Sequence, residues 1–307
     1  MTPLFEAGKP FDVVIIGGSF AGLAAAMPLA RARRSVCVID AGAPRNRYAA
    51  QSHGFFGQDG AAPFDLLQQA RQQLAAYPGV TFLQGQASSA AAQGEGFSVT
   101  LADGQTLSAS KLILAYGLTD ELPEIPGLQA RWGKTALHCP YCHGYEFAGQ
   151  ALGVLHVAPV SVHQALLISD WGPTALLLNG PAEIDDTLRS KLAQRKVQIE
   201  PTALVAIEGE PHGPLHVRLA DERVLTLNAL YLASHVHMNS PIAQQLGCDL
   251  DETPFGAIVR VDPTTRQTSV PGVYAAGDLA RLAASITFAV ADGMQAGVSA
   301  HQAMVFG

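Results

Sequence analysis

The stretch FDVVIIGGSFAG, residues 11–22, decides the fold of this chain. Residues 11–16 form a mostly apolar run of the kind found in parallel strands that are buried on both faces. A glycine turn comes next, then an Ala/Leu-rich helical stretch to about Arg34 and a second short strand over residues 35–39, which ends at Asp40. This order of strand, turn, helix, strand and acid predicts a βαβ unit that binds a dinucleotide.

The glycine turn matches the dinucleotide fingerprint with one departure. Gly17 permits the tight turn, and Gly22 lets the helix pack closely against the strand. Ser19 stands where a middle glycine usually lets the backbone approach the pyrophosphate, but its side chain is small and its hydroxyl can itself bond a phosphate oxygen. Backbone N–H groups at the helix start then face the phosphates. Asp40, 18 residues after Gly22, is expected to bond a ribose hydroxyl.

The rest of the chain predicts two nested nucleotide-binding domains. Residues 112–117 and 271–278 each form a short buried strand that ends in glycine, and residues 151–178 between them repeat a strand–helix–strand pattern. We therefore predict an α/β fold of two Rossmann-like, three-layer (ββα/βαβ) nucleotide-binding domains, with the second inserted into the first. The predicted bounds are 1–122 with 241–307 for the outer domain and 123–240 for the insert.

Composition and charge exclude several classes of function. Hydrophobic residues make up 48% of the 307 residues and charged residues 15%, which excludes a disordered chain. The net charge of −7, without a dense run of Lys or Arg, argues against a nucleic-acid partner. Asp12, the glycine turn and Pro28 interrupt the apolar residues 11–30, so we expect neither a signal peptide nor a membrane span. We expect a soluble, cytoplasmic protein.

Two of the four cysteines carry a chemical signal. Cys37 and Cys248 are expected to be small buried hydrophobes. Cys139 and Cys142 lie three positions apart where a helix is expected to begin, because Pro140 suits a first helical position. Such a pair can form a reversible disulfide, supply half of a zinc site, or be inert.

The histidines beside the pair favour redox chemistry over metal binding. His138 and His143 directly flank the cysteines, and ligands so placed cannot easily close around one ion, so we expect no metal. His143 is the natural proton carrier for a thiol that must lose and regain a proton near neutral pH. The alternative is that His143 is only a surface or packing residue.

Together the glycine turn, the Cys-x-x-Cys pair and Gly277-Asp278 resemble the low-molecular-weight thioredoxin reductase family of flavoproteins. The resemblance implies that the outer domain binds FAD, that the insert is an NAD(P)H-like domain carrying the cysteines, and that the protein is a homodimer. By position, Cys142 would face the flavin and Cys139 would exchange with the substrate. The FAD contacts predicted in this way, together with the βαβ residues, are Gly17, Gly18, Ser19, Phe20, Ala21, Gly22, Asp40, Arg45, Asn46, His53, Ala87, Ala115, Gly277, Asp278, Ile286 and Thr287.

One sub-branch of this family shares further residues with the chain. The run CPYCHGYE, residues 139–146, looks like the motif of dithiol oxidases that close disulfides in natural products such as gliotoxin, holomycin and romidepsin-type depsipeptides. Thioredoxin reductases proper carry an aspartate where His143 stands. Residues 44–47 (PRNR) and 52–55 (SHGF) also resemble that sub-branch, in which such residues line the flavin.

The insert departs from a nicotinamide-binding domain in two places. Its first strand is followed by residues 158–161, Ala-Pro-Val-Ser, which contain no glycine, and a proline has no N–H to offer a phosphate. The end of its next strand, residues 178–183, holds no basic residue for a 2′-phosphate, and the first one after it is Arg189. NADPH is therefore a doubtful ligand.

These observations favour an FAD-dependent dithiol oxidase that forms a disulfide in a small-molecule, natural-product dithiol. Electrons would pass from the substrate through Cys139 and Cys142 into FAD, and dioxygen or another acceptor would reoxidise the flavin. One alternative is an NAD(P)H-dependent reductase of thioredoxin or a small disulfide. The other, from a different class, is a flavin-binding redox sensor without turnover.

Overall fold

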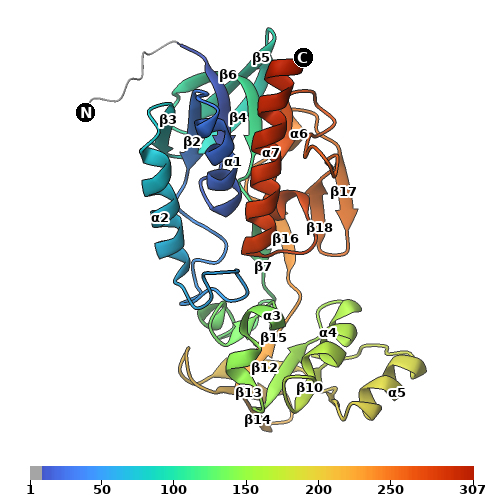
Figure 1. Cartoon of the computed structure of the whole chain (residues 1–307). Helices are drawn as coiled ribbons and strands as arrows, with labels where there is room; N and C mark the ends of the chain where they lie inside the picture. The colour runs from blue at the N-terminus through green and yellow to red at the C-terminus, as the bar shows by residue number, and fades with distance from the viewer. Residues whose placement is uncertain (1–8) are drawn as a thin grey trace. The chain divides into compact units, whose positions relative to one another are not determined.

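The computed structural model describes residues 9–307, which form two compact units (Figure 1). The first unit combines the described residues up to Arg45 with Pro63–Thr119 and Val236–Gly307. The second combines Asn46–Ala62 with Asp120–His235. The loop Asn46–Ala62 therefore groups with the second unit, although it precedes the predicted insert in the chain. Residues 1–8 of the predicted outer domain lie outside the described residues.

A mixed sheet of seven strands forms the centre of the first unit. Its order is β3-β2-β1-β6-β5-β4, and β19 pairs with Leu112–Leu114 of β6. The pairs among β1, β2, β3, β6 and β19 are parallel, whereas β4, β5 and β6 are antiparallel. The strand bounds are β1 Phe11–Ile16, β2 Val36–Asp40, β3 Val80–Gln84, β4 Ala87–Gln93, β5 Gly96–Leu101, β6 Thr106–Leu114 and β19 Val273–Ala275. The apolar run that opens the chain is a central strand, as the sequence predicts.

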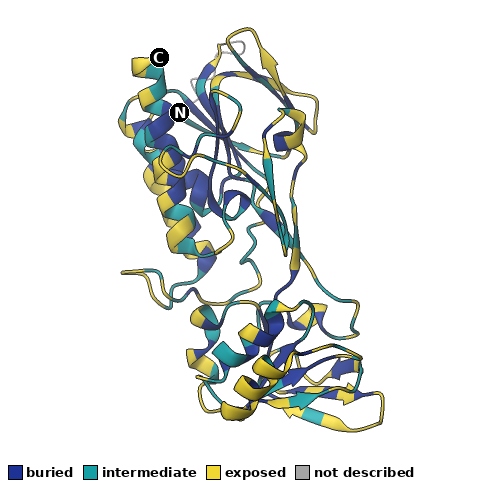
Figure 2. Ribbon diagram, turned by 90° about the vertical axis from the view of Figure 1, so that its right-hand side faces the viewer, coloured by how far each residue is buried: buried dark blue, intermediate teal, exposed yellow. Residues whose placement is uncertain are grey.

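Two helices cross closely on one face of this sheet. α1 (Phe20–Arg31) packs along α7 (Ile286–Phe306), and glycines of α7 allow the approach, since a Cβ on Gly293 would lie 2.0 Å from the carbonyl oxygen of Ala21. Figure 2 shows the sheet strands buried and the outer side of α7 exposed. Pro28 lies inside α1, and the helix ends at Arg31, just before Arg33 adopts a left-handed φ of 61°.

The first unit contains further helices and a hairpin. They are α2 (Pro63–Ala75), α6 (Ile242–Gln245), η3 (Gly277–Ala280), and the hairpin of β17 (Leu250–Thr253) with β18 (Gly256–Val259). A short two-stranded sheet joins β7 (Leu118–Glu121) to β16 (His235–Met238). Cys37 and Cys248 are buried and free, which confirms their expected burial.

The second unit has a parallel sheet of its own, in the order β11-β10-β9-β15-β8. The strands are β8 Ala136–Leu137, β9 Leu152–Leu155, β10 Thr174–Leu177, β11 Gln198–Glu200 and β15 Ala229–Tyr231. Helices α4 (Val160–Ile168) and α5 (Asp186–Gln194) belong to it, as do the short helices η1 (Gln129–Arg131), α3 (Pro140–His143) and η2 (Tyr145–Phe147). An antiparallel sheet of β12 (Leu204–Glu208), β13 (Leu215–Leu219) and β14 (Val224–Leu227) completes it. The two α/β units confirm the predicted fold class.

Within residues 9–307, no helix combines the length and the apolar character needed to cross a bilayer.

Candidate active site

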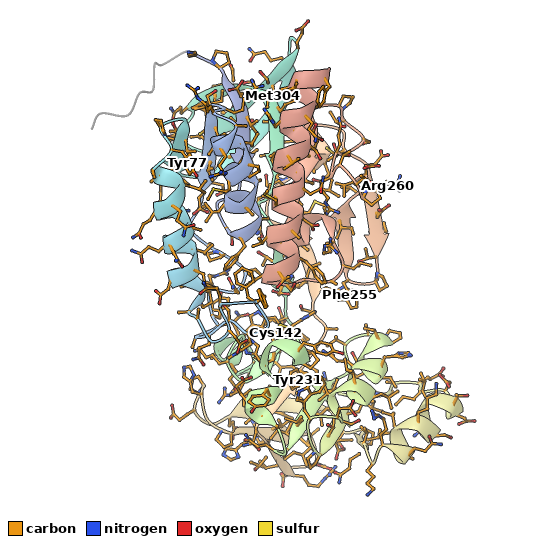
Figure 3. The ribbon with its side chains drawn as sticks, in the orientation of Figure 1. Tyr77, Cys142, Tyr231, Phe255, Arg260 and Met304 are labelled. Atoms are coloured by element: carbon orange, nitrogen blue, oxygen red, sulfur yellow. A yellow bond between two sulfur atoms is a disulfide. The ribbon has the colours of Figure 1, made fainter. Side chains whose placement is uncertain are left out.

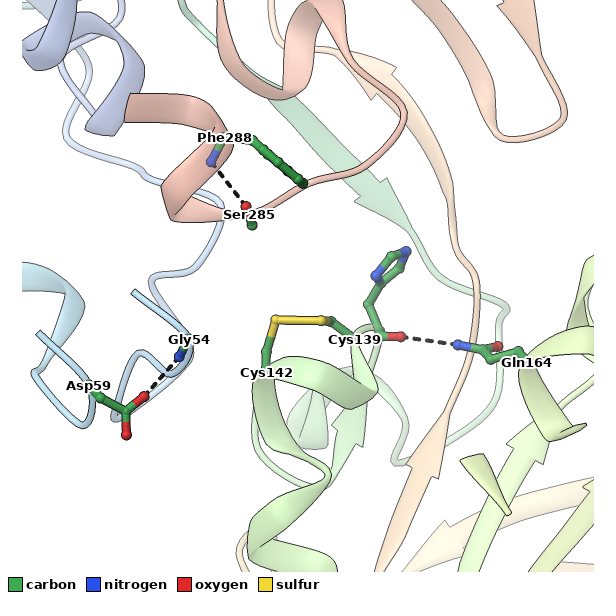
Figure 4. The surroundings of a disulfide bond; sticks show 8 residues. Gly54, Asp59, Cys139, Cys142, Gln164, Ser285 and Phe288 are labelled. Atoms are coloured by element: carbon green, nitrogen blue, oxygen red, sulfur yellow. Dashed lines mark hydrogen bonds between the residues drawn. A yellow bond between two sulfur atoms is a disulfide. The ribbon is translucent and has the colours of Figure 1, made fainter. Parts of the chain in front are cut away.

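The cysteine pair lies where a strand of the second unit ends and a helix begins. β8 leads into Cys139, which precedes α3 as its N-cap residue, and Pro140 occupies the first turn, as predicted. A disulfide joins Cys139 to Cys142, with 5.4 Å between their Cα atoms (Figure 4). From α4, Gln164 Nε2 donates a hydrogen bond of 3.0 Å to the carbonyl oxygen of His138. This bond fixes the backbone just before the first cysteine.

Trp171 packs against α3, the helix of the cysteine pair, which is called the redox helix below. Tyr141, between the two cysteines, is 72% exposed and meets Trp171 edge-on with ring centroids 5.5 Å apart. Gly144 follows the helix, and a Cβ there would lie 2.7 Å from Trp171 Nε1. Any other residue at position 144 would push Trp171 away, so this glycine permits the close packing behind the disulfide.

His143 is held as a neutral imidazole next to the second cysteine. Burial lowers its pKa, the carboxylate of Glu146 raises it, His53 lowers it, and the net direction is downward. A histidine with a lowered pKa remains unprotonated at neutral pH and can accept a proton from a thiol.

His53, which the resemblance assigns to the flavin, lies among the charged groups of the second unit. Its Nδ1 is 3.5 Å from Asp59 Oδ2, and its Nε2 is 3.4 Å from Glu146 Oε1. Its ring centroid is 6.4 Å from that of His143. The backbone N–H of Gly54 donates to Asp59 Oδ1 at 2.8 Å, and this bond, followed by that of His53, lowers the pKa of Asp59. Sequence reasoning did not find Glu146 or Asp59, because carboxylates are common on loops.

The glycine turn of the first unit forms a cradle that tolerates no side chains. Gly17 has a φ of 111°, and a Cβ there would lie 2.2 Å from the carbonyl oxygen of Ala115. A Cβ on Gly22 would lie 1.8 Å from the carbonyl oxygen of Gly17, and one on Gly18 would lie 2.6 Å from Cβ of Asp40. The structure thus brings these five residues, all predicted from the sequence, into one place.

The start of α1 stays open toward this cradle. Ser19 is the N-cap residue in an extended conformation, and its side chain makes no capping hydrogen bond. Phe20 and Ala21 form the first turn, whose N–H groups have no partner within the helix. Together with the helix dipole, these groups suit the pyrophosphate of a dinucleotide.

Arg71 is a residue of the cradle that sequence reasoning missed. It reaches from α2 to form an ion pair with Asp40, and it also donates to the carbonyl oxygen of Gly18 at 3.4 Å. Burial lowers the pKa of Arg71. The pairing holds the carboxylate of Asp40 beside the glycine turn. No local pattern reveals it, because the two residues are 31 positions apart.

The second predicted nucleotide signal, Gly277-Asp278, lies against the same part of the first unit. Gly277 has a φ of 74°, and a Cβ there would lie 2.9 Å from Cβ of Ala21. Asp278 accepts a hydrogen bond of 2.8 Å from Arg45 Nη1. Helix α7 then begins at Ile286, so that Ile286 and Thr287 form its first turn, capped by Ser285 Oγ, which accepts from Phe288 N at 3.1 Å.

The other predicted contacts are more scattered. Ala87 is 4% exposed in the core of the first unit, at the start of β4. Asn46 and His53 group with the second unit, apart from the cradle residues. Among the described residues, no cluster of three or more His, Cys, Asp or Glu could hold a metal ion.

The turn that would cradle a nicotinamide nucleotide is already filled by a side chain. Ser161 is fully buried, and its Oγ accepts hydrogen bonds from the N–H groups of Val157 at 3.1 Å and Ala158 at 3.4 Å. At the end of β10, Asn179 Oδ1 accepts from Leu204 N at 2.8 Å. Two backbone N–H groups of this turn, those of Val157 and Ala158, are therefore already bonded within the second unit.

The chain matches a known family over most of its length. The model of the family described as pyridine nucleotide-disulphide oxidoreductase matches residues 11–295. Among curated relatives, the chain is 34% identical over 299 residues to the thioredoxin reductase tcpT of Claviceps purpurea (strain 20.1), covering 93% of this chain and 92% of the relative.

Two solved structures are also similar over nearly the whole chain. An oxidoreductase from Agrobacterium tumefaciens has a TM-score of 0.93 at 43% identity, covering 97% of this chain and 99% of the other. HlmI has a TM-score of 0.91 at 36% identity, covering 98% of this chain and 94% of the other.

Proposed function

Within the pyridine nucleotide-disulphide oxidoreductase family, to which the chain belongs, we propose that it is a dithiol oxidase. It would close a disulfide in a small-molecule dithiol of the natural-product type. Dioxygen is the proposed electron acceptor. The coarser assignment, an FAD-dependent thiol–disulfide oxidoreductase, follows from the family itself.

The first unit offers a cradle that fits FAD. The close approaches at Gly17, Gly18 and Gly22 leave backbone without side chains beside the open start of α1, as a pyrophosphate requires. Asp40, held by Arg71, would bond the adenosine ribose, and Asp278, held by Arg45, would bond the ribityl or pyrophosphate portion. Ser19, Ala115 and the first turn of α7 are the further proposed contacts.

The observation that carries the proposal is Ser161, which occupies the nicotinamide turn. Because Val157 and Ala158 already donate to its hydroxyl, a phosphate there would have to displace a buried bond. Residues 178–183, at the end of β10, include no basic residue to meet a 2′-phosphate, which adds to this argument. A protein that does not receive electrons from NADPH must receive them from another donor, and a disulfide whose two cysteines are only partly buried suggests a dithiol.

The proposed chemistry uses the cysteines in fixed roles. A substrate thiol gives its proton to His143, and the thiolate attacks Sγ of Cys139, which breaks the disulfide and releases Cys142 as a thiolate. The second substrate thiolate then attacks the mixed disulfide, so that the product leaves with an S–S bond and both cysteines are reduced. When bound, FAD would supply the acceptor for this electron pair, with dioxygen as the proposed final oxidant.

An anaerobic experiment tests the direction of electron flow. The purified flavoprotein is mixed separately with NADPH and with dithiothreitol while the flavin absorbance is recorded. We expect bleaching by the dithiol alone, followed by hydrogen peroxide when air is admitted. Rapid bleaching by NADPH would overturn the proposal in favour of a disulfide reductase, and no bleaching by either would favour a redox sensor.

We also propose that the chain is a cytoplasmic homodimer. This rests on the family resemblance and on two buried cysteines that remain free. Light scattering of the purified flavoprotein tests the oligomeric state, and a monomeric mass would contradict it.

A further inference from the structure

We propose that His53 is a positioning residue of the redox centre, which carries protons between His143 and solvent from its place between the carboxylates of Glu146 and Asp59. The inference rests on the proposed function, because it concerns protons released when a dithiol is oxidised. It gives His53 a role at the redox helix.

The geometry connects the redox helix to an exposed carboxylate. Both ring nitrogens of His53 face an acid, Glu146 at 3.4 Å and Asp59 at 3.5 Å, and Glu146 comes three residues after His143. Along this route the exposed side-chain fractions are 37% for Glu146, 19% for His53 and 71% for Asp59, so the route ends at its most exposed group. A proton accepted at His143 therefore has titratable neighbours that end in water.

The loop of His53 is closed by its own hydrogen bonds. Ser52 N donates to Ala61 O at 2.8 Å, and Gly60 N donates to Ser52 O at 2.9 Å. Gly54 N donates to Asp59 Oδ1 within the same loop, as Figure 4 shows. The imidazole is thus presented by a preorganised turn, and Asp59 is fixed as its partner.

The buried phenol of Tyr231 is close enough to feel the charge of the Glu146 carboxylate. Tyr231, labelled with Cys142 in Figure 3, is fully buried, and its hydroxyl has no hydrogen-bond partner among the described residues. Burial raises its pKa, and the charge of Glu146 raises it further. The groups that act on His143 in this unit are therefore His53 and Glu146, with Tyr231 remaining neutral and Asp59 negative.

Such a route would let one base take up the two thiol protons in turn, although both protons finally leave in hydrogen peroxide. Oxidation of one dithiol to a disulfide releases two electrons, which reduce the cysteine pair and pass to the flavin, and two protons. His143 can take one proton at a time, so it must release the first before it accepts the second. His53 would receive that proton across Glu146 and give it to Asp59 and water, which restores His143 as a base.

Stopped-flow reduction by dithiothreitol across pH tests the relay in the holoenzyme. We expect His53→Gln to lower the plateau rate about tenfold, below the range for removal of a direct acid–base group. We expect added imidazole to restore His53→Gly, since the site is partly open to solvent. His216→Gln, on β13 in the same unit, is the matched control and should keep the wild-type rate.

The pH profile gives a second, signed expectation. The rate should fall as the pH drops through the lowered pKa of His143, because the imidazole then becomes protonated. His53→Gln removes a lowering influence, so the acid limb should move to higher pH. Glu146→Gln removes a raising influence, so it should move to lower pH while the plateau also falls. Plateau rates equal to wild type in both variants, with no response to imidazole, would overturn the relay.

Imidazole NMR titrations of the oxidised holoenzyme separate the two proposals. His53→Gln should raise, and Glu146→Gln should lower, the measured pKa of His143 without any turnover. If the pKa of His143 rises in His53→Gln and falls in Glu146→Gln, but dithiothreitol does not bleach the flavin, the relay residues interact as inferred and only the oxidase proposal fails. If dithiothreitol bleaches the wild-type flavin but neither substitution changes the pKa of His143, only the relay is contradicted.

Discussion

Gly22 packs so closely against the carbonyl group of Gly17 that no side chain fits at position 22. A Cβ on Gly22 would lie 1.8 Å from that oxygen, which no small rotation relieves. We expect Gly22→Ala to lower stability by about 1–3 kcal/mol through overpacking. It should also reduce the bound flavin, because the helix start moves away from the turn.

The ratio of flavin to protein absorbance and a thermal melt measure both effects. Gly213→Ala is the control, because a Cβ there meets ordinary contacts of 3.5 Å or more and the backbone needs no left-handed φ. A Gly22→Ala protein that retains full flavin would contradict the role of the turn.

The two cysteines differ at the residue scale, and a trapping experiment shows which one meets the substrate. With Cys142→Ser, a thiol that forms a disulfide with Cys139 has no neighbouring thiolate to displace it. We expect mass spectrometry to find a stable mixed disulfide on Cys139 when this variant is treated with an activated small disulfide. The buried Cys248→Ser variant should keep the cycling pair and accumulate no adduct. Faster trapping on Cys142 in the Cys139→Ser variant would reverse the assigned roles.

Helix α7 is fixed at the element scale by a buried ion network. Asp292 is 4% exposed and accepts from Arg266 Nη2 at 3.2 Å and from Arg281 Nη2 at 2.7 Å. Arg266 also donates to the carbonyl oxygen of Ala280 in η3. The network therefore connects η3 and its Gly277-Asp278 pair to the helix that packs on α1.

Removing the shared carboxylate should loosen this helix. We expect Asp292→Ala to destabilise the protein by about 3–5 kcal/mol, since two arginines lose a buried partner. Asp170→Ala, which breaks an exposed pair with Arg195, should change stability by less than about 1 kcal/mol. Thermal or urea unfolding of both variants makes the comparison, and equal losses would mean that the buried network adds nothing.

Elements with local signals were predictable, and contacts between distant residues were not. The run Phe11–Ile16 and the glycine turn carry their own periodicity and spacing, so the sequence predicts the βαβ unit and the helix after Cys139. Arg71 with Asp40, and Arg45 with Asp278, pair across 31 and 233 positions, and no local pattern predicts these pairings, although three of the four residues were predicted FAD contacts. The same holds for His53, whose carboxylate partner follows the redox helix far along the chain.

At the scale of the whole molecule, the sequence predicted the chemistry of the second unit better than its hydrogen-bond partners. The missing glycine after β9 predicted a poor phosphate turn, but only the structure shows that Ser161 fills it. A hydroxyl can accept hydrogen bonds from the same backbone N–H groups as a phosphate, so Ser161 takes the place that a nucleotide phosphate would occupy. The binding behaviour of the complete protein should reflect this difference between its two units.

Thermal stability measured with each nucleotide tests that difference. A ligand that binds only the native protein stabilises it by RT ln(1 + [L]/Kd), about 2.7 kcal/mol at one hundred times Kd. For a chain of 307 residues that is a shift in melting temperature of roughly 4 °C. We expect FAD added to flavin-depleted protein to raise the melting temperature by such an amount, through the cradle of Gly17 and Asp40. NADPH at millimolar concentration should leave it unchanged, because the N–H groups of Val157 and Ala158 are already bonded to Ser161. A matching rise with NADPH would mean that this serine gives way to a phosphate, and the second unit would then be a working nicotinamide domain.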